Sequence, residues 1–69
     1  MSARLDRLTE RQRIVLVGLA WSWTMKEIAD VLRIAEKTAA GHRVKMQRNL
    51  DVYDVAGLTR LAMKEGLVE

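Results

Sequence analysis

The clearest chemical signal in the chain is a cluster of basic residues between positions 36 and 50. Ammonium and guanidinium groups bind phosphate oxygens and the acceptor edge of guanine, and small neighbours let a helix approach the major groove of DNA closely. If this segment is a helix, its outer face combines such groups with small or apolar residues: Lys37, Ala40, Gly41, Val44, Lys45 and Arg48. The segment therefore predicts a helix that binds double-stranded DNA.

Catalytic and metal-binding chemistry has little support elsewhere in the sequence. The chain of 69 residues has no cysteine, and its one histidine, His42, has no recognisable nucleophile or base as a partner. One histidine with scattered carboxylates makes no metal cluster. A chain this short also has too small a core to surround a deep catalytic pocket. We therefore expect no enzyme activity, no metal and no cofactor.

Length and charge are typical of one small binding domain. Twelve Lys and Arg against nine Asp and Glu give a formal net charge of +3, a modest excess that suits an anionic partner. No segment resembles a signal peptide or reaches the roughly 20 apolar residues of a membrane span. We expect residues 1–69 to form a single cytoplasmic domain without a membrane anchor, associated with the nucleoid when it binds DNA.

The elements that position the basic segment are expected to be helices, so the fold class is all-α. No proline and no low-complexity linker interrupts the chain. Capping boxes at residues 9–12 and 24–27 satisfy free backbone N–H groups at two helix starts, and Asp54 caps a further helix that stops at Gly66. The predicted helices span about residues 10–21, 25–32, 36–50 and 55–65.

Apolar residues at helical spacing predict the core, because residues three and four apart share one face of a helix. Two methionines, Met46 and Met63, are interpreted as core filler. The residues expected to be buried are Leu8, Val15, Leu16 and Leu19, then Ile28, Ala29 and Leu32, then Ala39, Met46 and Leu50, and finally Val55, Leu58, Leu61 and Ala62.

The connection between the second and third predicted helices determines their angle. Arg33 and Ile34 leave room for only a tight turn, and helices joined so closely cannot lie antiparallel. They must cross steeply, which is the helix-turn-helix arrangement. The start of the second helix, at Thr24, Met25 and Lys26, is then predicted to bind a phosphate through free N–H groups and the lysine charge.

Several separated motifs add a family resemblance over residues 8–68. They are LTER at 8–11, KEIA at 26–29, Leu32, Ile34, EKT at 36–38, His42, Leu50, Val52, Ala62 and GLV at 66–68. In this order and spacing the chain resembles the LuxR-type, GerE-like helix-turn-helix domains. The resemblance implies a four-helix domain that binds promoter DNA, with the third helix in the major groove and a dimer contact often through the fourth. Most members carry this domain behind a receiver or ligand-binding domain.

The third helix departs from the family pattern where the family reads DNA. The usual T-V-K-x-H becomes T-A-A-G-H at residues 38–42, so Ala40 stands in place of an expected lysine, and Ala35 replaces the usual Ser or Thr cap. These changes fit an altered operator preference, binding that needs a partner, or a domain that has exchanged DNA contact for protein contact. The predicted DNA-binding residues are Thr24, Met25, Lys26, Lys37, Thr38, Ala40, Gly41, His42, Arg43, Val44, Lys45 and Arg48. For His42, a phosphate contact and a structural role remain equal alternatives.

The first helix has an apolar side, where the family is usually polar, and Gly18 replaces a family leucine. Either a tryptophan folds back over Gly18, or the side is an exposed patch for a second protein. Helical phase places Trp21 about 170° from the centre of the buried stripe, which favours the patch. The predicted protein contacts are Ile14, Val17, Trp21 and Trp23 on this side, and Val55, Leu58, Thr59 and Ala62 for a weak homodimer through the last helix.

These features predict a DNA-binding transcriptional regulator. The alternative is a protein-interaction module, or an antagonist that pairs with a LuxR-type regulator and withholds it from DNA. It draws on Ala40, Gly41 and Val44 and on the apolar side of the first helix. A third interpretation is the promoter-binding region of a sigma factor, which shares the helix-turn-helix but less often ends in A-x-x-x-G-L-V.

Overall fold

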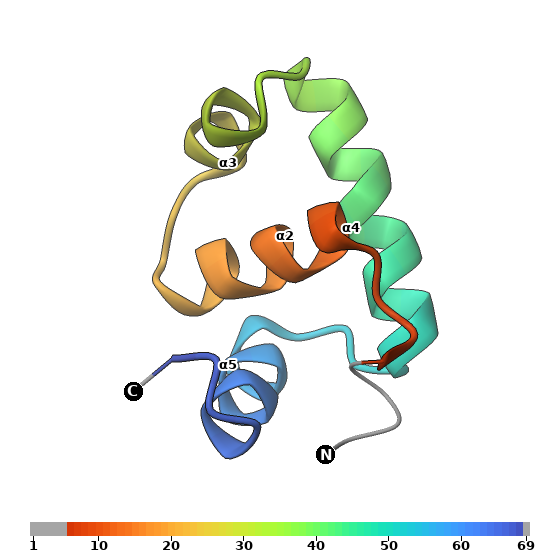
Figure 1. Cartoon of the computed structure of the whole chain (residues 1–69), viewed down its shortest axis with the longest axis vertical. Helices are drawn as coiled ribbons and strands as arrows, with labels where there is room; N and C mark the ends of the chain where they lie inside the picture. Colours follow the sequence, from red (N-terminus) through yellow and green to blue (C-terminus); the bar gives the residue numbers. More distant parts are fainter. Residues whose placement is uncertain (1–5, 69) are drawn as a thin grey trace.

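The computed structural model describes residues 6–68, and this part of the chain is helical with short connections (Figure 1). Its helices are α2 (Glu10–Ala20), α3 (Met25–Leu32), α4 (Glu36–Leu50) and α5 (Val55–Lys64). The all-α prediction is confirmed, and each helix begins at the predicted residue; α2 and α5 end one residue earlier than predicted. Residues 1–5 and 69 of the predicted domain lie outside the described residues.

The predicted capping signals form at the helix starts. Thr9 Oγ1 accepts a hydrogen bond from the Gln12 backbone N–H at 3.1 Å, and Gln12 Oε1 accepts one from the Thr9 N–H at 3.2 Å. The box of Thr24 and Glu27 is formed in the same way at the start of α3. At the start of α5, Asp54 accepts from a backbone N–H at 3.0 Å. Each cap satisfies a donor that has no partner within its own helix.

Residues with a left-handed backbone conformation end α3 and α4 and keep the connections after them short. Arg33, with φ 57°, terminates α3, and Asp51, with φ 56°, terminates α4. After α5 this conformation is taken by Gly66, with φ 75°, and the Leu67 N–H donates back to the Ala62 carbonyl at 2.9 Å. Gly66 therefore occupies the predicted C′ position, where a residue without a Cβ avoids strain.

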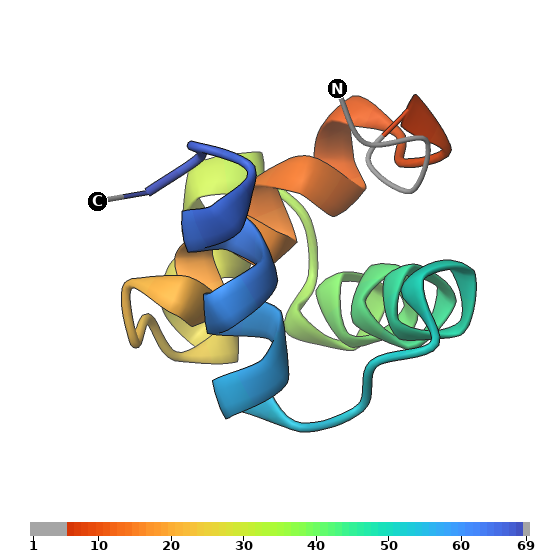
Figure 2. The same ribbon diagram turned by 90° about the horizontal axis from the view of Figure 1, so that it is seen from below.

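Helix α2 lies at the centre and packs against α3, α4 and α5, while α3 also packs against α4. In Figure 1, α3 is seen nearly end-on and α4 runs along the page, so the two cross steeply as a helix-turn-helix requires. Seen from below, α5 lies beside α2, and α4 stands to one side (Figure 2). The α3–α4 pair is therefore carried on a support made by α2 and α5. No helix within residues 6–68 has the length and hydropathy that crossing a membrane requires.

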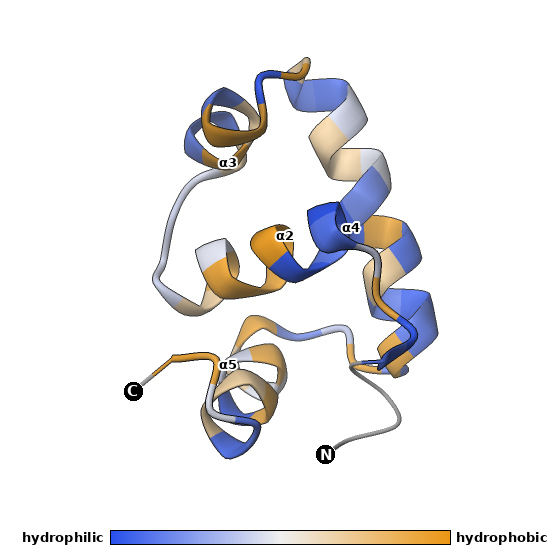
Figure 3. Cartoon of the chain, viewed as in Figure 1, coloured by the Kyte–Doolittle hydropathy of each residue, from blue (hydrophilic) through white to orange (hydrophobic). Residues whose placement is uncertain are grey.

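The core forms where α3, α4 and α5 face α2. Leu32 and Leu61 are only partly buried. The predicted core residues that are buried are Leu8, Val15, Leu16, Leu19, Ile28, Ala29, Ala39, Met46, Leu50, Leu58 and Ala62. In Figure 3 the middle of α2 is hydrophobic, whereas α4 is mostly hydrophilic. A central apolar helix thus leaves much of α4 free to face solvent.

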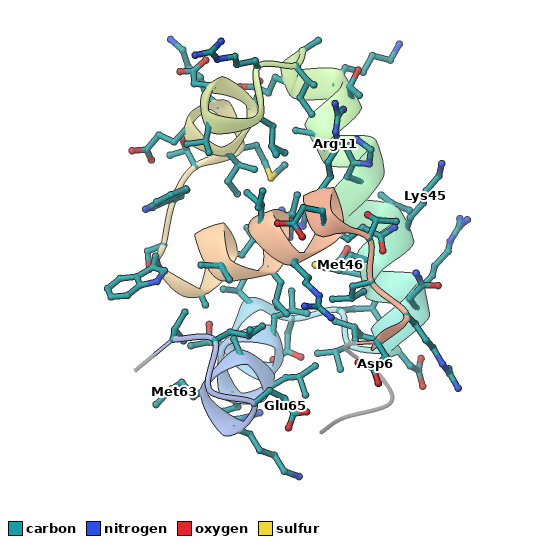
Figure 4. The ribbon with its side chains drawn as sticks, in the orientation of Figure 1. Asp6, Arg11, Lys45, Met46, Met63 and Glu65 are labelled. Carbon is teal, nitrogen blue, oxygen red and sulfur yellow. The ribbon has the colours of Figure 1, made fainter. Side chains whose placement is uncertain are left out.

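Two predicted core residues of α5 are exposed, so the prediction was wrong for them. Val55 is 43% exposed and Met63 is 52% exposed. Val55 is the first residue of α5, where the loop from α4 enters. Met63 lies about 100° around the helix from the buried Ala62, and this rotation turns it away from α2. Figure 4 shows Met63 at the outer side of α5.

Candidate nucleic-acid interface

The solvent side of α4 carries a line of four residues, Lys37, Gly41, Val44 and Arg48, which we call the outer stripe. All four are exposed. Their spacing of four, three and four residues keeps them within about 60° of one another around the helix. The residues on the opposite side are buried: Ala39, Met46 and Leu50. Burial of one side therefore orients the outer stripe toward solvent.

Two exposed residues flank the outer stripe, Ala40 on one edge and Lys45 on the other. Lys45 projects away from the body of the molecule, whereas the next residue, Met46, points toward α2 (Figure 4). Within residues 6–68 neither Lys45 nor the two cations of the outer stripe forms an ion pair. Their charges are free to meet phosphate.

Arg43 and His42, both predicted to bind DNA, do not lie on the outer stripe. Both side chains are half-buried. Arg43 is rotated by about 130° from the stripe and lies toward the core. The Nε2 atom of His42 is buried and has no hydrogen-bond partner among the described residues. Thr38, the remaining predicted contact on this helix, is exposed on the same side of α4 as Lys45, about two turns before it.

Two hydrogen bonds hold the C-terminal half of α4 in place. Gln47 Nε2 donates to the Tyr53 carbonyl at 3.1 Å, which ties α4 to the loop before α5. Asn49 Nδ2 donates to Gln12 Oε1 at 3.3 Å, which ties it to the start of α2. The N-terminal end is different, because Ala35 supplies no side-chain cap, as the sequence predicted. The orientation of α4 thus depends on its C-terminal half and its buried face.

The predicted phosphate anchor at the start of α3 is solvent accessible. Thr24 and Lys26 are exposed, whereas Met25 is partly buried. The Glu27 carboxylate accepts from the Thr24 N–H at 2.8 Å, which places a negative charge at this helix end. A phosphate here must overcome that charge, so the Lys26 ammonium is the group that makes the anchor attractive.

A second surface lies between α2 and α3, away from the outer stripe. It is an open groove lined by Ile14 and Val17 of α2, Trp23 of the turn and Val31 of α3, with Glu10 and Arg13 at its rim. Val31, which is 55% exposed, was not among the residues that the sequence predicted for a protein contact. Its exposure on a short helix was not evident from its apolar character alone.

The sequence left two alternatives, a tryptophan folded back over Gly18 or an exposed apolar patch, and each tryptophan follows a different one. A Cβ built on Gly18 would lie 2.7 Å from Ile28 Cγ1 and 3.1 Å from Trp23 Cε3, so the side chains of Ile28 and Trp23 together fill the space that the glycine leaves. Trp21 is 58% exposed and caps the end of α2 with its backbone. Trp23 therefore packs against Gly18, and Trp21 projects outward as its helical phase predicted.

Two of the predicted interface residues on α5 are unavailable to a second protein. Leu58 and Ala62 are completely buried in the domain's own core, so their assignment to an interface was wrong. Val55, Thr59 and Met63 instead share one side at spacings of four residues, and all three are at least partly accessible. The spacing of Met63 from Thr59 was the signal that could have identified it.

The residues that could hold a metal ion are not gathered anywhere in the described part of the chain. No group of three or more His, Asp or Glu side chains comes together within residues 6–68. What the described surface offers is an exposed basic helix face, an accessible helix N-terminus and an apolar groove.

Comparison with known proteins agrees with this geometry. Residues 6–62 match the family model described as bacterial regulatory proteins, luxR family. The chain is 38% identical over 63 residues to the transcriptional regulatory protein MctR of Rhizobium johnstonii, covering 91% of this chain and 29% of that protein. It is 34% identical over 62 residues to the uncharacterized response regulatory protein YgeK of Escherichia coli K12, covering 90% and 42% respectively.

The chain spans less than half the length of either relative. No solved structure matches it. The family match nevertheless covers all of α2, α3 and α4, together with most of α5. The chain therefore belongs to the luxR family of bacterial regulatory proteins, and helices α2 to α5 match that family's helix-turn-helix DNA-binding domain.

Proposed function

We propose that this domain regulates transcription by binding promoter DNA with α4 in the major groove and the start of α3 on the phosphate backbone. The observation that carries the proposal is the outer stripe, whose two cations lie at its ends and form no ion pair with any of the described residues. Lys37 and Arg48 are eleven residues apart, a rise of about 16 Å along the helix, which is about five base steps of a DNA strand. A single groove contact can thus engage both ends of the stripe.

The named relatives support the same role. One carries the name of a transcriptional regulatory protein and the other that of a response regulatory protein. A regulator that acts on the bacterial chromosome works in the cytoplasm. DNA binding of this kind needs no cofactor, because Lys and Arg side chains and backbone N–H groups supply the contacts.

A titration of duplex DNA at several salt concentrations tests the proposal. Each phosphate contact adds about −0.9 to the slope of log affinity against log salt, so Lys45→Ala should flatten the slope by about one unit. Arg48→Ala should weaken affinity and flatten the slope if it meets phosphate, or reduce sequence preference if it meets guanine. Lys64→Ala on α5 is the matched control and should change neither. If Lys45→Ala and Arg48→Ala both bind as the unaltered domain does, α4 is not the DNA-binding helix.

A weak homodimer through α5 is the second part of the proposal. Val55, Thr59 and Met63 offer an accessible stripe, and the Thr59 hydroxyl is turned inward to its own helix, donating to the Val55 carbonyl at 2.9 Å. So small an interface is expected to hold a dimer only when both copies are on DNA. Sedimentation with a palindromic duplex should show two copies per duplex, and Met63→Lys should reduce this to one. One copy per palindrome in the unaltered domain would remove the dimer.

A further inference from the structure

The centre of the outer stripe has no side chain that can form a hydrogen bond. Gly41 and Val44 are three residues apart, and Ala40 and Val44 are four apart, so these residues are neighbours on the helix surface. Ala40 and Gly41 are exposed, and Val44 is 46% exposed. We call these three residues the apolar centre. It separates Lys37 from Arg48 along the helix.

The fold of the described residues does not explain why position 41 is a glycine. A Cβ placed on it would meet no atom of residues 6–68 within 4 Å, and its φ is not in the left-handed region. Glycine at the middle of a helix is destabilising by about 1 kcal/mol relative to alanine. Since neither packing nor backbone conformation requires it, the missing Cβ serves an approach from outside, and it lets a partner come close to the α4 backbone.

In the proposed function that partner is DNA, which the cations at the two ends of the stripe would attract. The chemistry of base edges then limits what the apolar centre can read. Base pairs present hydrogen-bond donors and acceptors in the major groove, together with one apolar group, the C5-methyl of thymine. Alanine and valine side chains cannot replace the water on donors and acceptors, and leaving such groups without partners is unfavourable. A methyl group is the one feature that these side chains bind favourably.

We propose that the apolar centre reads thymine methyl groups, so that the preferred DNA site has A·T pairs at the middle of the α4 contact. This inference rests on the proposed function, because it needs α4 in the major groove. Val44 and Ala40 supply the surface against the methyl groups, and Gly41 allows the approach. Lys37 and Arg48 then contact phosphate or guanine on either side of the A·T pairs.

The test uses the tightest duplex of about 20 base pairs selected from a random-sequence pool. It is resynthesised with deoxyuridine at each thymidine in turn, which removes the C5-methyl and keeps the pairing. Deoxyuridine at a contacted position should weaken binding about three- to fourfold, which is the effect of losing one buried methyl group. At thymidines outside the α4 contact the substitution should leave affinity unchanged.

Protein variants show which side chain senses the methyl group. At one or two thymidine positions, the Val44→Ala variant should no longer distinguish the two duplexes. It should bind the duplex with thymine and the duplex with uracil at that position with nearly equal affinity. Val31→Ala is the matched control, because Val31 is also an exposed valine but lies in the groove between α2 and α3. It should keep the full discrimination. Circular dichroism of both variants verifies the fold.

The outcomes separate the inference from the proposed function. If the domain binds a duplex in a salt-dependent way, but equally well with thymine or uracil at every position, it does not read methyl groups. DNA binding itself would then still stand. Discrimination that persists unchanged in Val44→Ala overturns the role of the apolar centre. A pool from which no duplex is enriched at any salt concentration removes the proposed function itself.

Discussion

The side chain of Asn49 donates a hydrogen bond to Oε1 of Gln12 at 3.3 Å, which joins α4 to the first turn of α2. The same oxygen accepts the Thr9 N–H at 3.2 Å, and Gln12 is only 5% exposed. One nearly buried amide oxygen therefore closes the cap of the central helix and anchors the helix that carries the basic face. The two tasks connect helix formation directly to the placement of the DNA-binding surface.

Replacing Gln12 by alanine should lower the free energy of unfolding by about 1 to 2 kcal/mol, because it removes half of a capping box and the acceptor for Asn49. Urea denaturation measures the change. Glu27→Ala is the control, since Glu27 closes the equivalent box on α3 at an exposed position. It should cost less. Gln12→Ala and Asn49→Ala should also be non-additive in a double-mutant cycle, and strict additivity would contradict the linkage.

Gly18→Ala should destabilise the domain although alanine favours a helix. The new Cβ would lie 2.7 Å from Cγ1 and 2.9 Å from Cδ1 of Ile28, whose side chain is completely buried. Overpacking of this kind costs about 1 to 3 kcal/mol, and over most of that range it exceeds the gain in helix propensity of about 1 kcal/mol. Thermal denaturation should show a lower midpoint. Ile28→Val, which removes Cδ1, should restore part of the loss in the double variant, and an unchanged or raised midpoint in Gly18→Ala contradicts the packing.

Gly41→Ala should have the opposite effect on stability. No atom of the described part of the chain lies within 4 Å of the added Cβ, so only helix propensity changes, and the free energy of unfolding should rise by about 1 kcal/mol. The same denaturation experiment therefore gives opposite signs for two glycine-to-alanine changes in one domain. DNA affinity should fall despite the gain in stability, because the Cβ holds α4 further from the groove. Unchanged affinity would show that position 41 does not approach DNA.

Trp21→Ala should change stability by no more than about 0.5 kcal/mol, because 58% of the side chain is exposed. Trp23→Ala should cost more, about 2 kcal/mol, since Trp23 covers Gly18 and lines the α2–α3 groove. Chemical denaturation of the two variants makes the comparison. If the Trp21 surface contacts another protein, Trp21→Ala should also weaken that association. A loss of several kcal/mol with association unchanged would make Trp21 part of the core instead.

Local signals in the sequence determined the helices. A capping box needs only residues three apart, so Thr9 with Gln12 and Thr24 with Glu27 predicted the starts of α2 and α3 without knowledge of the fold. Gly66 predicted the end of α5 for an equally local reason, since it relieves strain at a positive φ. The steep crossing of α3 and α4 also followed from the sequence, because a very short turn permits few other geometries.

Tertiary packing decided which sides of these helices are covered. Helical phase assigns a residue to one side of its own helix. How much of that side is buried depends on where the neighbouring helices lie. The position of α2 buries Leu58 and Ala62 and leaves Met63 exposed, although all three are apolar residues of α5. Likewise, Trp23 lies over Gly18 and Trp21 does not, because the turn after α2 brings only one of them back to the helix. Burial depends on pairs of surfaces, and helical phase describes only one surface of each pair.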